Sequence, residues 1–215
     1  MAFTVKLSNG ISKNQAMNVI DGSVFARQIG LPLNRAITFN CSILNVSSLE
    51  VAHRFSKLST DWIRTKGCTT SHLWVRENPK GIDNLHWTAH VPTHLTKEYT
   101  TIQMDWIRRI AGKYRKGGIQ SQKIGIRPGE RDRVLTDIEF LNHLERWIGY
   151  CLKGCDESVC DYLEIRHKPQ GGVWGRRVGL SENISRKARQ TARFEFRRRG
   201  AGMFPVRARM EFLPV

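Results

Sequence analysis

Residues 69–91 read TTSHLWVRENPKGIDNLHWTAHV, and this stretch decides the fold. Apolar and polar side chains alternate over residues 69–77, and the alternation resumes over residues 85–91, which is the pattern of half-buried β-strands. The letters NPKG at residues 78–81 are typical of a turn between two strands. The stretch therefore predicts a β-hairpin.

The second strand of this hairpin separates polar from apolar side chains. Residues two apart on a strand share a face, because successive side chains point to opposite sides. One face carries Asn84, His86, Thr88 and His90, and the other carries Leu85, Trp87 and Ala89. We expect the polar face to point away from the core and the apolar face to pack into it.

The segments around the hairpin predict an α+β fold. Alternation within AITFNCSIL, residues 36–44, predicts a further strand, and residues 122–127 predict another short one. Apolar spacing and capping residues predict helices that begin at Ser47 or Ser48, at Thr93 or Thr96, and at Thr136, and that end near Gly67, Gly112 and Gly154. This order of elements favours a central antiparallel sheet with helices packed mainly on one face.

The chain is long enough for one sizeable core, since it has 215 residues of which 40% are hydrophobic. We expect that core in residues 34–163. Residues 1–33 mix Ser, Asn and Gly with short apolar pieces, which is typical of an N-terminal arm. Residues 164–215 carry 13 Lys and Arg against 4 Asp and Glu, so they are expected to form a basic C-terminal extension.

The charge of the chain points to a polyanionic partner. Its 35 Lys and Arg outnumber 19 Asp and Glu, which gives a formal net charge of +16 and a pI of about 10.2. No apolar run approaches the roughly 20 residues of a membrane span, and the N-terminus lacks the apolar core of a signal peptide. We therefore expect a cytoplasmic protein that binds nucleic acid rather than a membrane. Phosphate contacts are expected from Arg176, Arg177, Arg186, Lys187, Arg189, Arg193 and Arg197.

The five cysteines do not form a distributed disulfide framework, because their number is odd and three of them lie within ten residues. This arrangement suggests a reducing compartment. Cys151, Cys155 and Cys160, with His167 further on, are also a candidate zinc site. They lack the C-x2-C pairs of common structural zinc motifs, so zinc is the less favoured interpretation.

The hairpin carries a candidate metal site. Asn84 and His86 stand roughly 7 Å apart on one face of the strand, so their side chains can converge on one ion. Glu77 closes the preceding strand and joins them if the register of the turn allows it. A carboxylate, an imidazole and an amide oxygen together suit Mn²⁺ or Mg²⁺. His90 lies roughly 13 Å from His86 along the strand, too far to share that ion. The alternative is that both histidines are simply polar-face residues of a sheet.

The predicted helix from Thr136 to Gly154 carries a candidate nucleophile. Tyr150 and Lys153 are three residues apart, so both side chains rise from one face of the helix. An ammonium group there can lie beside the phenol or beside a phosphate that the phenol attacks. The alternative is that Tyr150 is a rim residue of an amphipathic helix.

These residues, in this order, resemble the HUH endonucleases, which nick single-stranded DNA in rolling-circle replication and plasmid transfer. The family has two His around one bulky apolar residue on a central strand, commonly an upstream Glu, and a downstream helical Tyr often followed three residues later by Lys. The matching residues here are Leu85 for the apolar residue, His86 for the second His, Glu77, Tyr150 and Lys153. The resemblance covers residues 34–154, and AITFNCSIL resembles the family's first motif.

The resemblance implies a ferredoxin-like or RRM-like sheet and a replication-initiator-like nickase. It implies catalysis by Tyr150 and Lys153, Mn²⁺ or Mg²⁺ bound by Glu77, His86 and Asn84, and a covalent link to the 5′-phosphate of single-stranded or hairpin DNA. Asn84 departs from the pattern, because it stands where the family has its first His. An amide oxygen is a weaker ligand than imidazole for transition metals, so metal affinity should fall and shift toward hard cations.

Two alternatives to a nickase follow from the same residues. The first is a DNA-binding protein without turnover, such as a degenerate initiator or a repressor, and Asn84 is its best support. The second is an RNA-binding protein in which Trp74 and Trp87 stack on bases. That second interpretation weakens if the two tryptophans lie in the core.

Overall fold

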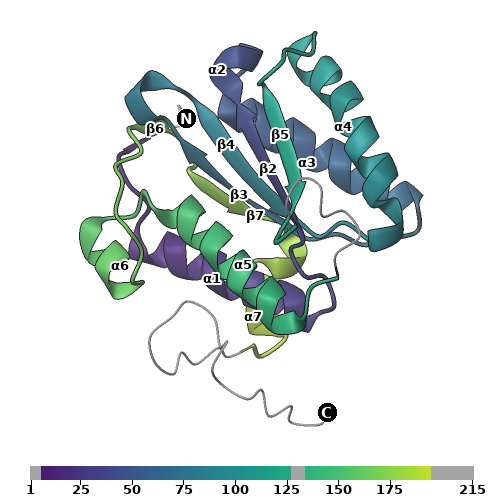
Figure 1. Cartoon of the computed structure of the whole chain (residues 1–215). Helices are drawn as coiled ribbons and strands as arrows, with labels where there is room; N and C mark the ends of the chain where they lie inside the picture. Colours follow the sequence, from purple (N-terminus) through teal and green to yellow (C-terminus); the bar gives the residue numbers. More distant parts are fainter. Residues whose placement is uncertain (1–5, 127–133, 195–215) are drawn as a thin grey trace.

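A five-stranded antiparallel sheet forms the centre of the protein (Figure 1). The computed structural model describes residues 6–126 and 134–194. The strand order is β5-β2-β4-β3-β7, and each neighbouring pair is antiparallel. The strands are β2 (Arg35–Asn40), β3 (His72–Glu77), β4 (Asn84–Ala89), β5 (Ile119–Lys123) and β7 (Val178–Leu180).

The predicted hairpin is confirmed as β3 and β4. Glu77 lies directly opposite Asn84, and Trp74 lies opposite Trp87. A short 3₁₀ turn, Pro79–Gly81, joins the strands. Its Gly81 has a φ of 81°, a left-handed conformation that a residue without a Cβ adopts readily.

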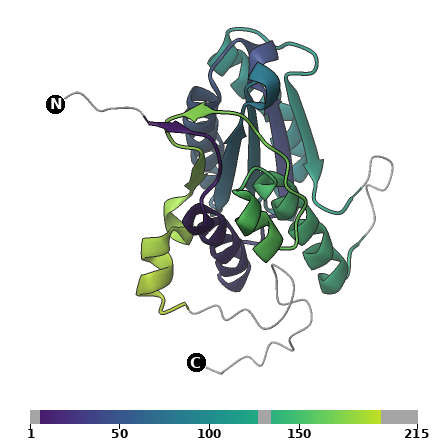
Figure 2. The ribbon, with the colours of Figure 1, turned by 90° about the vertical axis from the view of Figure 1, so that its left-hand side faces the viewer.

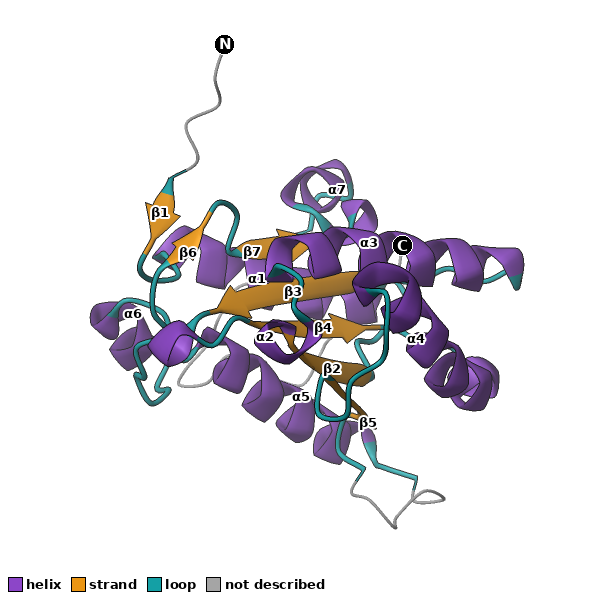
Figure 3. Cartoon of the chain, turned by 90° about the horizontal axis from the view of Figure 1, so that it is seen from above, coloured by secondary structure: helices purple, strands orange, loops and turns teal. Residues whose placement is uncertain are grey.

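Helices cover both faces of this sheet, so the expectation of helices mainly on one face is wrong. One face packs on α3 (Ser48–Thr65) and α4 (Thr96–Ala111), and the other on α1 (Lys13–Gln28) and α5 (Asp137–Leu152). Figure 3 shows α3 and α5 on opposite sides of the strands. The face that looks polar in β4 is apolar in β3 and β7, where Leu73, Val75 and Val178 are buried. A second helical layer is needed to cover these side chains.

Residues 13–28 are part of the core rather than an N-terminal arm. They form α1, which begins with a capping box in which Ser12 and Gln15 bond each other's backbone N–H. Buried residues include Val19, Ile20 and Phe25, and the buried Ser23 hydroxyl donates to the Val19 carbonyl at 2.8 Å. Small and polar residues on this buried face obscure the apolar period of the sequence, which is why the pattern does not predict the helix.

The boundary predicted at residue 164 is also wrong. β6 (Val173–Trp174) pairs with β1 (Leu7–Ser8), and β7 adds an edge strand to the main sheet. α7 (Arg186–Thr191) then packs against α1. The chain from residue 164 to residue 194 therefore belongs to the same folded body, because its strands and helix complete both the sheet and the core.

The remaining expectations are met with shifts at the element ends. Three predicted helices correspond to α3, α4 and α5, and the strand predicted over residues 36–44 stops at Asn40. There the Asn40 side chain caps the one-turn helix α2 (Cys41–Leu44) by accepting from the N–H of Ile43. A further short helix, α6, spans Glu157–Tyr162. Among the described residues, no helix has the length and apolar content to cross a bilayer.

Candidate functional site

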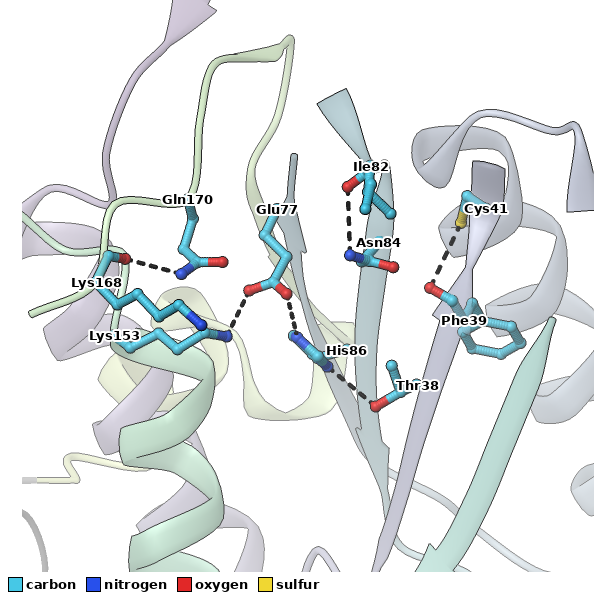
Figure 4. Close-up of polar contacts among 10 residues, drawn as sticks. All are labelled: Thr38, Phe39, Cys41, Glu77, Ile82, Asn84, His86, Lys153, Lys168 and Gln170. Carbon is cyan, nitrogen blue, oxygen red and sulfur yellow. Dashed lines mark hydrogen bonds and ion pairs between the residues drawn. The ribbon is translucent and has the colours of Figure 1, made fainter. Parts of the chain in front are cut away.

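A chain of four polar side chains lies between the sheet and the end of α5 (Figure 4). Thr38 Oγ1 lies 3.1 Å from His86 Nδ1, and His86 Nε2 lies 3.0 Å from Glu77 Oε1. The other carboxylate oxygen of Glu77 accepts from Lys153 Nζ at 2.6 Å. The predicted approach of Glu77 and His86 on adjacent strands is therefore confirmed.

Strand register and one helix end bring these side chains together. Thr38 on β2 lies directly opposite His86 on β4, and Glu77 on β3 lies opposite Asn84, two residues from His86. Paired residues of an antiparallel ladder share a face, so Thr38, Glu77 and His86 all lie on the face that α5 covers. Lys153 is the residue that ends α5, and its ammonium group reaches back to Glu77. The site therefore exists only where β2, β3, β4 and α5 meet.

Glu77 is ionised throughout the physiological range. Burial by itself would raise the pKa of its carboxyl group, but the contacts with His86 and Lys153 lower that pKa to about 2. Only 6% of the Glu77 side chain and 9% of the Lys153 side chain are exposed. A buried ion pair that is screened so little by water is costly to break from one side.

Tyr150 covers this buried chain and is itself open to solvent. Tyr150 is 48% exposed, while its ring centroid lies 5.2 Å from that of His86. Lys153 Nζ lies 3.7 Å from the centre of the Tyr150 ring, so the two residues share one side of the helix as predicted. The structure thus places a reachable phenol directly over a buried Glu, His and Lys.

Trp147 holds Tyr150 in this position, and sequence reasoning missed it. Its ring stacks on Tyr150 with centroids 5.6 Å apart, and its Nε1 donates to Thr88 Oγ1 at 2.8 Å. Thr88 lies on the same face of β4 as His86. A Trp three residues before a helical Tyr was a usable signal, because that spacing places both rings on one helix face.

A small pocket opens beside Tyr150, between α5 and the β2–β5 edge. Its volume is about 250 Å³. Its lining includes Gln122 from β5 and His143, Arg146, Trp147 and Tyr150 from α5. The pocket offers amide, imidazole and guanidinium donors next to the exposed phenol, and Arg146 adds a positive charge there.

Glu77 and His86 have the geometry of two adjacent metal ligands. Ligands that hold an octahedral ion at about 2.1 Å lie about 3 Å apart, which matches the 3.0 Å between Glu77 Oε1 and His86 Nε2. That Nε2 atom is buried and makes no aligned hydrogen bond to the described residues, although its distance to Glu77 is that of an ion pair. A cation bound between the two groups would replace the contact of Nε2 with Glu77: Thr38 would then accept from Nδ1–H, and the lone pair of Nε2 would face the cation.

Asn84 and His90 do not join this pair. The Asn84 carboxamide shares the correct face of β4, but its nitrogen is bonded to the Ile82 carbonyl at 3.3 Å (Figure 4). His90 donates to the Pro32 carbonyl at the far end of the strand, as its distance from His86 predicted. Burial lowers the pKa of His90, although its bond to Pro32 opposes this. Asn84 is a ligand only after its side chain turns.

The predicted phosphate-binding arginines divide into exposed and structural residues. Arg177 and Arg189 are buried and donate to backbone carbonyls, Arg177 to Ser8 at 2.6 Å and Arg189 to Ile184 at 2.6 Å. Their assignment as phosphate-binding residues is therefore wrong. The members that solvent reaches are Arg176, Arg186, Lys187 and Arg193, and Arg197 lies outside the described residues.

The basic residues on the surface of α7 lie away from Tyr150. Figure 2 shows α1 between α7 and α5, and α7 packs against α1. The exposed Arg146 lines the pocket beside Tyr150, the buried Lys153 contacts the Tyr150 ring, and the exposed Lys168 neighbours Lys153. Lys168 is placed by its N–H, which donates to the Lys153 carbonyl at 2.8 Å. These two surface cations were not among the predicted phosphate-binding residues.

Two alternative interpretations of the sequence lose their structural basis. All five cysteines are unpaired, and the described residues bring no three His, Cys, Asp or Glu side chains together around a metal position. Cys160 instead directs its thiol to the carbonyls of Lys153 and Cys155. Trp74 and Trp87 are buried in the core, so they are not surfaces for stacking RNA bases.

Comparisons of the chain with protein-family models, with curated proteins and with solved structures return no match.

Proposed function

We propose that the protein is a replication-initiator-like nickase that cleaves single-stranded DNA by attack of Tyr150 on a phosphodiester, as the resemblance to HUH endonucleases implies. One observation carries this proposal: Tyr150, a residue that is 48% exposed, lies over a buried chain of Lys153, Glu77 and His86. A tyrosine that served only to complete a helix rim would not need three buried polar partners beneath it.

In the proposed reaction, the Tyr150 hydroxyl oxygen forms a bond to phosphorus while the bond from phosphorus to the leaving O3′ breaks. The phenolic proton passes to water, and the O3′ group takes up a proton as it leaves. The protein remains joined to the 5′-phosphate, and the reverse reaction reseals the strand. Lys153 and Arg146 would offset the negative charge that develops on the phosphate.

Within this proposal, Glu77 and His86 would hold Mn²⁺ or Mg²⁺, with the Asn84 amide oxygen as a third ligand after the side chain turns. A bound divalent cation would withdraw charge from the scissile phosphate. The residues of the chain do the remaining work. Thr38 orients the imidazole of His86, and Trp147 fixes the ring of Tyr150 above it.

The test is a search for a covalent protein–DNA adduct. A pool of random-sequence single strands labelled at the 3′ end should give a labelled protein band that resists SDS, because Tyr150 retains the downstream piece. Tyr150→Phe should abolish the band. Tyr162→Phe is the matched control, since Tyr162 is 57% exposed and also lies beneath a lysine, with Lys13 Nζ 4.6 Å from its ring centre. The proposal fails if Tyr150→Phe labels as well as the parent.

A second candidate function is DNA binding without cleavage. The observation that favours it is the placement of Asn84, whose amide is bonded to its own strand instead of turning toward Glu77 and His86. This candidate predicts retention of labelled single strands on a filter by both the parent and Tyr150→Phe, with no SDS-resistant band from either.

A further inference from the structure

We propose that Lys153 competes with the divalent cation for Glu77, so that the metal site opens only when the phosphate of a bound strand draws the Lys153 ammonium group away. This inference rests on the proposed function. It makes metal binding and strand binding cooperative, with Lys153 as a positioning residue that links the two.

The competition follows from the contacts of the Glu77 carboxylate. One oxygen lies 3.0 Å from His86 Nε2, a spacing that two ligands of one cation would have, and the other is bonded to Lys153 Nζ at 2.6 Å. A divalent ion beside Oε1 would therefore lie close to an ammonium group in a site from which water is nearly excluded. The repulsion between these two cations lowers the affinity for the metal while Lys153 stays in place.

Lys153 also lies close to where a phosphate would bind at Tyr150, and that phosphate would be a second anionic partner for its ammonium group. Its Nζ lies 3.7 Å from the Tyr150 ring centre, so a phosphate that approaches the Tyr150 hydroxyl comes within reach of a flexible four-carbon side chain. The backbone N–H of Lys153 is bonded to the Tyr150 carbonyl at 3.4 Å, which anchors the main chain while the side chain turns. The phosphate replaces Glu77 as the anionic partner of Lys153, and Glu77 is then free for the metal.

Thermodynamic linkage makes the effect on metal binding and the effect on strand binding equal. If a bound strand raises the affinity for the metal by some factor, the metal raises the affinity for the strand by the same factor. Removal of the ammonium group should raise the metal affinity of the free protein and erase this coupling. We expect a change of about tenfold or more, within the usual range of such couplings.

The experiment measures Mn²⁺ binding by calorimetry and by the electron paramagnetic resonance signal of free Mn²⁺, in a Tyr150→Phe background that blocks cleavage. Lys153→Met, which keeps the length of the stem, should bind Mn²⁺ about tenfold more tightly than the Tyr150→Phe parent. Lys97→Met is the matched control, because Lys97 is exposed on α4, which covers the other face of the sheet from Glu77, and it should change nothing.

A second measurement asks whether DNA changes the Mn²⁺ affinity while Lys153 is in place. An excess of random-sequence single-stranded DNA should raise the Mn²⁺ affinity of the Tyr150→Phe protein by about tenfold and leave that of the Tyr150→Phe, Lys153→Met protein unchanged. The inference is overturned if DNA leaves the Mn²⁺ affinity of the first protein unchanged, or if no protein binds Mn²⁺. These results are independent of the adduct assay, so the nickase proposal and the competition can fail separately.

Discussion

Glu77 is the residue on which the site depends, because it contacts both His86 and Lys153 from a buried position. A carboxylate placed there without partners would be protonated by the cost of burial. The contacts with His86 and Lys153 reverse that effect and lower the pKa of the Glu77 carboxyl group to about 2. The same contacts that stabilise the fold also keep an ionised carboxylate close to Tyr150.

Glu77→Gln should lower the free energy of unfolding at pH 7 by about 3 kcal/mol, because it leaves the Lys153 ammonium buried without a counter-charge. The pKa of the Glu77 carboxyl is about 2 in the folded protein and about 4.3 in an unfolded chain. The stabilisation is therefore complete above about pH 4.3 and is lost as the pH falls toward 2.

Urea unfolding at pH 7 and at pH 3 should show this trend, with a smaller gap between parent and variant at pH 3. Glu50→Gln is the control, since Glu50 pairs with Arg54 on the surface and should matter by about 0.5 kcal/mol at most. A gap that stays constant between the two pH values would contradict the assignment of an ionised Glu77.

Asn84→His should raise the affinity for Mn²⁺ and, if the protein nicks, raise the yield of the Tyr150 adduct. Asn84 lies directly opposite Glu77 and two residues from His86 on one face, so an imidazole there reaches the proposed cation. Imidazole is also a better donor than a neutral amide for this class of ion.

Asn84→Gln, which keeps the amide, should leave Mn²⁺ affinity near that of the parent in the same titration. Tighter Mn²⁺ binding by Asn84→His without any adduct would favour the non-catalytic function. Unchanged Mn²⁺ affinity would remove Asn84 from the proposed ligand set.

At the scale of elements, the site is built by α5 crossing one face of the sheet while α1 packs next to it. α5 supplies Trp147, Tyr150 and Lys153 from its C-terminal end, and Leu144 and Ile148 hold it to the core. α1 fills the space on the same face with its own buried side chains, Val19 and Ile20 among them. Removal of α1 would expose the apolar part of β3 and loosen the surface on which α5 lies.

Ile20→Ala should therefore destabilise the protein by about 2–4 kcal/mol, because Ile20 is fully buried and its truncation leaves a cavity. Ile29→Ala makes the same chemical change at a position that is 39% exposed, just after the helix, and should destabilise by less than about 1 kcal/mol. Thermal and urea unfolding of the two variants measure this difference in stability. Equal effects would mean that residues 1–33 behave as an arm after all.

At the scale of the whole molecule, the basic residues behind the net charge of +16 have two roles. Some are buried and form hydrogen bonds within the fold, and others lie on the surface. Arg177 and Arg189 donate their hydrogen bonds to backbone carbonyls, while Arg186 and Lys187 face the solvent on α7. Basic residues that look equivalent in the sequence should therefore respond differently to mutation.

The double variant Arg186→Gln, Lys187→Gln should leave the melting temperature unchanged and reduce the salt dependence of DNA binding. On a single strand the log–log slope should fall by about 0.7 for each phosphate that the variant no longer neutralises. Arg189→Gln should instead destabilise the fold by about 2 kcal/mol, since its guanidinium also donates to Asn18 at 2.6 Å. Binding titrations at several salt concentrations, with melting curves, check both. An unchanged slope for the double variant would show that α7 does not contact the strand.

Local sequence was sufficient for the features that depend on neighbours in the chain. Alternation and the NPKG turn predicted β3 and β4, and the capping residues Ser47 and Thr136 marked the starts of α3 and α5. The proximity of Tyr150 to Lys153 followed from helical spacing, whereas that of Glu77 to His86 depended on the register of the turn, which the sequence left open.

Only the tertiary structure decided the features that join distant segments. The ion pair between Glu77 and Lys153 spans 76 residues, and its existence depends on where α5 crosses the sheet. The burial of Arg189 depends on α7 meeting α1, and the role of α1 depends on the apolar side chains that β3 and β7 present to it. Sequence periodicity and secondary-structure propensity describe one helix or strand at a time. Burial instead depends on how several helices and strands pack against one another.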